Sequence, residues 1–114
     1  MSTTKFLYLY RSPASAPSKP PSPEEMQAMF ASWTAWKTKY NQEIIDIGDA
    51  LKPGGAVFKG GVVTDGPFIE SKEIMAGYSI VQTSSLARAV EISKDCPMNH
   101  IPGASIEVRE LAGF

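Results

Sequence analysis

The sequence has few of the residues that build covalent or metal-bound frameworks. It contains one cysteine, Cys96, and one histidine, His100, among 114 residues. A single thiol cannot form an intrachain disulfide, and neither residue has a second ligand of its kind at a metal-binding spacing. The sequence therefore predicts no metal site, and its low cysteine content suits the reducing environment of the cytoplasm.

Long apolar runs and an excess of charge are also absent. No stretch approaches the roughly 18 apolar residues of a membrane-spanning helix, and the N-terminus lacks the pattern of a secretion signal. The 11 basic and 12 acidic residues give a formal net charge of −1. Such a chain has no strong field to attract nucleic acid or an anionic membrane. We therefore expect a cytoplasmic protein that binds neither of them.

The length of the chain and its 43% hydrophobic residues predict a single domain over residues 1–114. Five prolines fall within residues 12–23 (SPASAPSKPPSP), which predict an exposed, extended loop. A domain of this size buries only somewhat more than ~60% of its unfolded-chain surface. Association with a second copy is therefore a natural way to add buried surface.

Hydrophobic periodicity predicts a strand and then a helix in the first third of the chain. Residues 5–11 (KFLYLYR) predict a strand with its aromatic side chains on one face and its leucines on the other. Ser22 can cap a helix that starts at Pro23 and ends near Asn41. Methionines and aromatic residues recur at helical spacing between residues 26 and 40 and predict an apolar stripe. Core packing explains this stripe better than a cofactor pocket does.

The remaining two thirds of the chain contain three further strands and a second helix. After residues 44–47, a turn of helix can fit around residues 48–51, and residues 56–64 predict a strand with a bulge at Gly60 and Gly61. Residues 74–83 predict the next strand, which makes the segment between the two a hairpin connection. Residues 85–96 predict a short amphipathic helix, for which Ser84 and Ser85 are good caps and which Pro97 stops. Residues 104–111 alternate as a final strand.

The predicted order β-α-β-β-α-β belongs to the α+β class. It is the ferredoxin-like plan, with a four-stranded antiparallel sheet and two helices on one face. The opposite face of the sheet carries apolar side chains together with charged ones such as Glu107 and Arg109. A monomer would leave this face in water, so we expect two sheets to pair face to face as a homodimeric α/β barrel.

The second half of the sequence resembles a known protein family. The segments TDGPFIESKE, GYSIVQTSSLARAVEISKDCP and IEVREL follow one another between about Val63 and Leu111. They are similar to the DGPF-type members of the YCII-related proteins, which are small bacterial proteins of the dimeric α/β-barrel class. The resemblance implies a dimeric ferredoxin-like fold. It implies no settled biochemical role. Proposals of enzymatic activity in the family depend on a polar pocket with acidic and histidine residues.

The acidic residues around the DGPF motif are the first candidates for chemistry. Asp65 and Glu70 flank a Gly-Pro bend, and two neighbouring carboxylates can separate their pKa values so that one acts as acid and the other as base. Alternatively, Asp65 caps the turn and Glu70 forms a local ion pair. Histidine side chains titrate near neutral pH, so His100 could act as a general base, or it could be an exposed loop histidine.

Tyr78 and Arg109 are the candidates for binding a ligand. The guanidinium of Arg109 could hold a carboxylate or phosphate through two parallel hydrogen bonds, or it could pair with a carboxylate of the protein itself. The glycine-rich segments match no nucleotide-binding motif, so we expect no nucleotide cofactor.

Three functions remain open from the sequence. The first is a dimer that binds a small polar or anionic molecule in a pocket of the barrel. The second is a cofactor-independent enzyme in which Asp65 and Glu70 move protons and Arg109 orients the substrate. The third is a structural partner of another protein.

Overall fold

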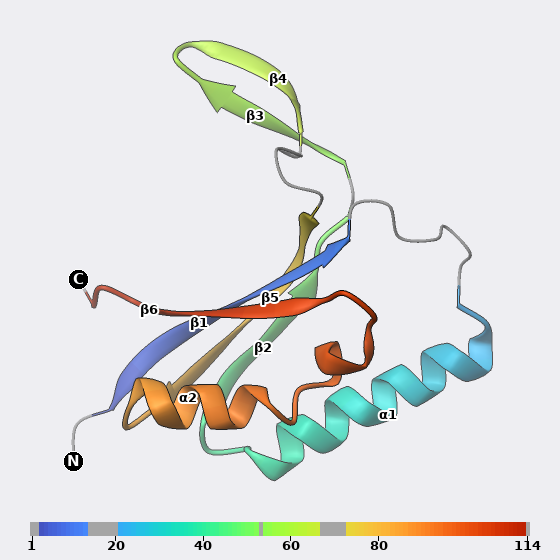
Figure 1. Ribbon diagram of the computed structural model, residues 1–114, viewed down its shortest axis with the longest axis vertical. Coiled ribbons are helices and arrows are strands. Elements are labelled where there is room, and N and C mark those ends of the chain that lie inside the picture. The colour runs from blue at the N-terminus through green and yellow to red at the C-terminus, as the bar shows by residue number, and fades with distance from the viewer. Residues whose placement is uncertain (1–2, 14–20, 53, 67–72, 114) are drawn as a thin grey trace.

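The computed structural model describes residues 3–13, 21–52, 54–66 and 73–113. Figure 1 shows the elements in the order β1 (Thr4–Pro13), α1 (Pro23–Lys39), β2 (Ile44–Ala50), β3 (Gly55–Lys59), β4 (Val62–Gly66), β5 (Glu73–Thr83), α2 (Leu86–Ser93), the 3₁₀ helix η1 (Pro97–His100) and β6 (Ser105–Glu110).

Four strands form one antiparallel sheet in the order β2-β5-β1-β6. Both helices cover the same face of this sheet (Figure 1). This arrangement confirms the predicted α+β class and its ferredoxin-like order. In the part of the chain that the structure describes, neither helix has the length and hydrophobicity of a membrane span.

The core lies between the helices and the aromatic face of β1. Phe6, Tyr8 and Tyr10 are buried there, as their alternation with the leucines predicted. The Tyr10 hydroxyl donates to Ser79 Oγ at 2.6 Å, and the Tyr8 hydroxyl donates to the carbonyl oxygen of Ala89. Each buried hydroxyl therefore has the partner that its burial requires. The rest of the buried apolar cluster comprises Trp36, Ile44, Val81, Ala89, Ile92, Cys96 and Met98.

Helix α1 begins where the sequence predicted, but only its C-terminal half joins the core. Ser22 accepts a hydrogen bond from the Glu25 backbone N–H, and Glu25 accepts one from the Ser22 backbone N–H. Trp36 is 3% exposed, whereas Phe30, two turns earlier, is 69% exposed. The prediction that the whole apolar stripe packs in the core was therefore wrong for its first half, which extends past the sheet.

Strand β2 was missed, because the sequence favoured a helical turn around residues 48–51. Instead, β2 pairs with β5, and its register shifts between Ile44 and Asp46 and again between Asp46 and Asp49. Gly48 lies within this irregular part with φ at +74°, where a Cβ atom would lie 1.8 Å from the carbonyl oxygen of Tyr78. Only glycine fits such a close approach of two backbones.

Residues 55–66 form a separate hairpin, not the single bulged strand that the sequence predicted. Strands β3 and β4 make a two-stranded sheet of their own, with Phe58 opposite Val63 and Lys59 opposite Val62. Gly60 and Gly61, with φ of +59° and +82°, form the two-residue turn. We call this hairpin the arm, because it projects from the body of the molecule (Figure 1).

The rest of the predicted order is confirmed. Strand β5, helix α2 and strand β6 lie where they were expected, and Ser85 caps α2 by accepting from the Arg88 backbone N–H at 3.1 Å. Within the proline-rich segment, residues 12 and 13 belong to β1, while residues 14–20 lie outside the described residues. Residues 67–72, which include Pro67, Phe68 and Glu70, lie outside them as well.

Candidate functional site

The sheet face that the helices leave uncovered, which we call the open face, carries side chains in rows across three strands. One row joins Ile80, Leu7 and Arg109, and the next joins Tyr78, Leu9 and Glu107. A third row joins Met75, Arg11 and Ser105. Because cross-strand partners point to the same face, these rows place an apolar centre beside a charged border.

Two arginines share one carboxylate at this border. Glu107 accepts hydrogen bonds from Arg11 Nη2 at 3.0 Å and Nε at 3.3 Å, and from Arg109 Nη1 at 3.1 Å. The two guanidiniums, Arg109 foremost, hold the pKa of the Glu107 carboxyl below its ordinary value of 4.5. The carboxylate therefore stays ionised at neutral pH, and the three side chains together carry one excess positive charge.

This border can bind an anion. A guanidinium has five N–H donors in a fixed plane, and the contacts to Glu107 use one donor of Arg109 and two of Arg11. Side chains of Arg109 and Arg11 therefore retain donors for a carboxylate or phosphate. Leu7 and Leu9 beside them are only half-buried, so the face has apolar surface for the rest of a ligand or for a second protein chain.

The structure separates the predicted site residues into groups. Tyr78 and Arg109 lie on the open face in adjacent rows. Asp65 lies on the arm, exposed and opposite Ala56. His100 ends η1 on the helix-covered side and lines a shallow groove of about 340 Å³ with Trp36 and Lys39 of α1. Glu70 lies outside the described residues.

Arg11 is the residue of this site that sequence reasoning missed. Strand alternation places it on the same face as Leu7 and Leu9, so the signal was present in the sequence. Its partner Glu107 lies 96 residues away. Only the register of β1 against β6 brings the two together, and one sequence does not fix that register.

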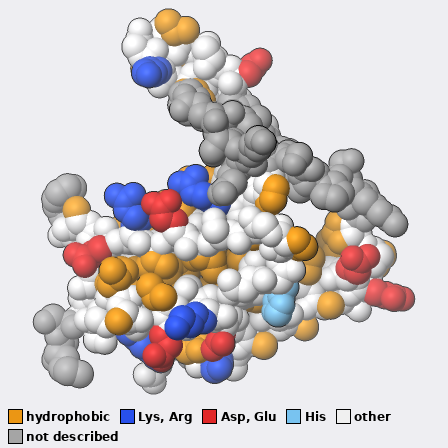
Figure 2. All heavy atoms as spheres, in the orientation of Figure 1, with side chains coloured by type: hydrophobic (Ala, Val, Ile, Leu, Met, Phe, Trp, Pro, Cys, Tyr) orange, Lys and Arg blue, Asp and Glu red, His pale blue; other side chains and the backbone are white. Residues whose placement is uncertain are grey.

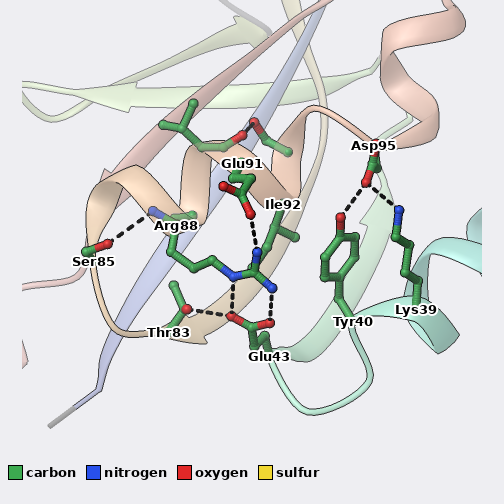
Figure 3. Close-up of polar contacts among 12 residues, drawn as sticks. Lys39, Tyr40, Glu43, Thr83, Ser85, Arg88, Glu91, Ile92 and Asp95 are labelled. Carbon is green, nitrogen blue, oxygen red and sulfur yellow. Dashed lines mark hydrogen bonds and ion pairs between the residues drawn. The ribbon is translucent and has the colours of Figure 1, made fainter. Parts of the chain in front are cut away.

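A second polar cluster joins the end of α1, the turn before β2, the end of β5 and α2 (Figure 3). Arg88 donates to both carboxylate oxygens of Glu43, from Nε at 3.0 Å and from Nη2 at 2.9 Å, and Thr83 Oγ1 donates to Glu43 at 2.6 Å. Asp95 accepts from Lys39 at 2.9 Å and from the Tyr40 hydroxyl. These charged groups satisfy one another, so the cluster clamps the elements together and offers no open ligand site.

The ion pair between Glu43 and Arg88 in this cluster predicts a specific dependence of stability on pH. The hydrogen bond from Arg88 is the largest influence on the pKa of Glu43 and, with help from Thr83, lowers it below its ordinary value of 4.5 although burial opposes this shift. A carboxyl with a lowered folded-state pKa stabilises the fold above its unfolded pKa, and this contribution disappears as the pH falls through the folded pKa. We expect Glu43→Gln to lower the melting temperature at pH 7 by several degrees and to lower it less and less below pH 4.5.

Glu91→Gln is the matched control for this prediction. Glu91 also pairs with Arg88, but its side chain is 64% exposed and water screens the pair. Thermal unfolding followed by circular dichroism between pH 3 and 7 should show little change for this variant. Equal losses for both variants at every pH would contradict the structural importance of Glu43.

Cys96 does not contribute a reactive group. It is fully buried beside Tyr10, and burial raises the pKa of its thiol to about 11. The thiolate that would act as a nucleophile is therefore scarce at neutral pH. Among the described residues, no three of the histidine, cysteine, aspartate and glutamate side chains are placed to hold a metal ion.

The sequence is similar to a domain family and to a bacterial protein. The YCII-related domain model matches residues 6–114, which include both helices and all of the four-stranded sheet except the first two residues of β1. The chain is also 37% identical over 51 residues to an uncharacterized protein of Rhizobium meliloti (strain 1021). That match spans 45% of this chain and 41% of the relative, so the chain covers well under two thirds of the relative's length. The family match alone covers nearly the entire chain, and the protein belongs to the YCII-related family.

Proposed function

We propose that two copies of this chain join through their open faces into an α/β barrel that binds a small anionic molecule beside Arg11 and Arg109. The observation that carries this proposal is the shared carboxylate, because two guanidiniums around Glu107 leave one positive charge uncompensated. The proposal places the protein in the cytoplasm, in keeping with its single, buried cysteine.

The apolar part of the open face supports the homodimer. Leu7, Leu9, Tyr78 and Ile80 occupy adjacent positions on the two central strands, β1 and β5, and none of them is fully buried in one chain. Water would contact this contiguous apolar surface in a monomer. Pairing two identical faces about a two-fold axis would bury it, since such an interface uses the same patch twice.

The charges support an anionic ligand. A dimer built on this face brings two clusters of Arg11, Glu107 and Arg109 into one interface, and each cluster carries one excess positive charge. Removing like charges from water costs free energy unless a counter-charge accompanies them. A small carboxylate or phosphate between the arginines would supply that counter-charge and would itself be held by charge-assisted hydrogen bonds.

The positions of the acid and base candidates favour binding over catalysis. Asp65 lies on the arm, and His100 lies on the helix-covered side, whereas Arg109 and Tyr78 share the open face. A general acid or base must come within hydrogen-bonding reach of the substrate that the binding residues hold. Within one chain, neither Asp65 nor His100 shares a face with Arg109, so the cofactor-independent enzyme remains the weaker candidate.

Anion binding can be measured by isothermal titration calorimetry with inorganic phosphate and malonate as probes. The wild-type protein should bind at least one probe. Arg109→Gln should weaken that binding roughly tenfold or more, because the variant loses a charge-assisted contact to the anion. Lys94→Gln is the control, since Lys94 is an exposed cation that caps the C-terminus of α2 on the other side of the sheet.

Two results would contradict the proposed site. The first is a wild-type protein that binds neither probe at low ionic strength. The second is an equal loss of affinity in Arg109→Gln and Lys94→Gln, which would indicate general attraction to surface charge and no defined site.

A further inference from the structure

The arm exposes apolar side chains on both of its faces. Phe58 and Val63, which are direct cross-strand partners, are 71% and 67% exposed on one face. Val62 is 59% exposed on the other face, opposite Lys59. An isolated two-stranded hairpin is marginally stable in water and needs a surface to pack on. No described element of the same chain adds a strand to the arm, which stands as a separate sheet.

The N-terminal half of α1 exposes a complementary apolar surface. Met26, Met29 and Phe30 lie on one face of the helix, at the spacing of neighbouring turns, and are 46%, 49% and 69% exposed. The same face continues into Trp33, which packs edge-on against Tyr10 with 5.6 Å between ring centroids. The apolar stripe of α1 therefore packs on the core at its C-terminal end, whereas in its first two turns no described residue buries it. We call Met26, Met29 and Phe30 the overhang.

We propose that the arm of one copy packs on the overhang of a second copy, and that the exchange is reciprocal. This inference depends on the dimer proposed above. Each chain has one arm and one overhang, so a two-fold axis satisfies both surfaces in both copies and leaves no open end for further growth. A single kind of contact thereby covers the overhang together with Phe58 and Val63 of the arm.

Charge favours the same pairing. The tip of the arm carries Lys59 beside its apolar residues. The first turn of α1 carries Glu24 and Glu25, and the first lysine of the helix is Lys37. Glu25 precedes Met29 by one turn and so borders the overhang. A basic tip would meet an acidic helix end, where the backbone N–H groups already favour the two carboxylates.

The placement of the two surfaces permits the exchange. The arm rises at the top of Figure 1, and the first turns of α1 extend to the right of the sheet. A two-fold axis that passes between these directions carries the arm of the second copy toward the helix of the first. Figure 2 shows hydrophobic and basic side chains exposed at the end of the arm and hydrophobic side chains along α1.

Crosslinking between differently labelled chains tests the exchange. Val63→Cys and Met29→Cys proteins are refolded together from denaturant, so that mixed dimers form, and are treated with a short bismaleimide. We expect a covalent dimer in the mixture and none from either variant alone. Replacing Met29→Cys by Ala28→Cys, on the opposite side of α1, should abolish the product. The native Cys96 is buried and should stay unreactive, which the wild-type protein checks.

Sedimentation equilibrium separates failure of the exchange from failure of the dimer. Phe58→Ser should raise the dimer dissociation constant roughly tenfold or more, because each arm loses a buried aromatic ring. A dimer that forms without the Val63–Met29 crosslink, or with equal product from Ala28→Cys, overturns the exchange and leaves the open-face dimer intact. A protein that stays monomeric at every concentration overturns both.

Discussion

Replacing Trp36 with alanine should lower the free energy of unfolding by about 3–5 kcal/mol, a typical loss for a large aromatic residue in a core. Trp36 is 3% exposed, and its ring packs against Tyr8 and Trp33 with centroid distances of 6.2 and 5.6 Å. Its Nε1 donates to the carbonyl oxygen of Ile92 at 3.1 Å. The single side chain therefore joins α1 to both β1 and α2, and its removal leaves a cavity and breaks the hydrogen bond between the two helices.

Urea unfolding at fixed protein concentration measures this loss, because association with a second copy would otherwise shift the midpoint. Trp36→Phe keeps most of the ring volume and loses only the Nε1 hydrogen bond, so it should be markedly less destabilised. Leu86→Ala is the control on α2, since Leu86 is 54% exposed and should change stability by less than about 0.5 kcal/mol. An unfolding midpoint of Trp36→Ala equal to that of the wild type would contradict the described core.

The order of the elements could be predicted where periodicity and capping agreed. Strand β1 alternates aromatic and aliphatic residues, and Ser22 and Ser85 both cap helices as expected. Strand β2 could not be recognised in the same way. It contains two aspartates and Gly48, which disfavour strands, and its place in the sheet depends on pairing with β5, from Ile44 with Val81 to Ala50 with Gly77. Tertiary pairing here outweighs local preference.

The arm follows from a signal that is present in the sequence. The predicted bulge at Gly60 and Gly61 is wrong, because a Gly-Gly pair between two apolar runs is typical of a two-residue hairpin turn. The candidate site was predictable only in part. Alternation predicts that Arg109 and Glu107 share a face, but the long-range register of three strands adds Arg11 to them.

Replacing Leu9 with lysine should abolish the dimer. Leu9 lies at the centre of the open face, between Tyr78 and Glu107. Without the burial of Leu9, the free energy of association weakens by about 2 kcal/mol for each of the two copies, which corresponds to a roughly thousandfold higher dissociation constant of the dimer. The added charges repel the arginine clusters of the opposite copy. Within one chain, the new lysine faces the Glu107 carboxylate, so the monomer should keep its fold.

Leu86→Lys is the matched control for this substitution. It adds the same charge to an exposed leucine on the helix-covered side, where no interface is proposed. Circular dichroism should show that both variants are folded. Only Leu9→Lys should change the state of association.

Sedimentation equilibrium of the wild-type protein and of Leu9→Lys at the same micromolar concentrations tests the open-face dimer most directly. The wild type should have twice the chain mass of 12.3 kDa, and Leu9→Lys should have the mass of one chain. A wild-type protein that sediments as a single chain, or a Leu9→Lys variant that remains dimeric, would contradict association through this face.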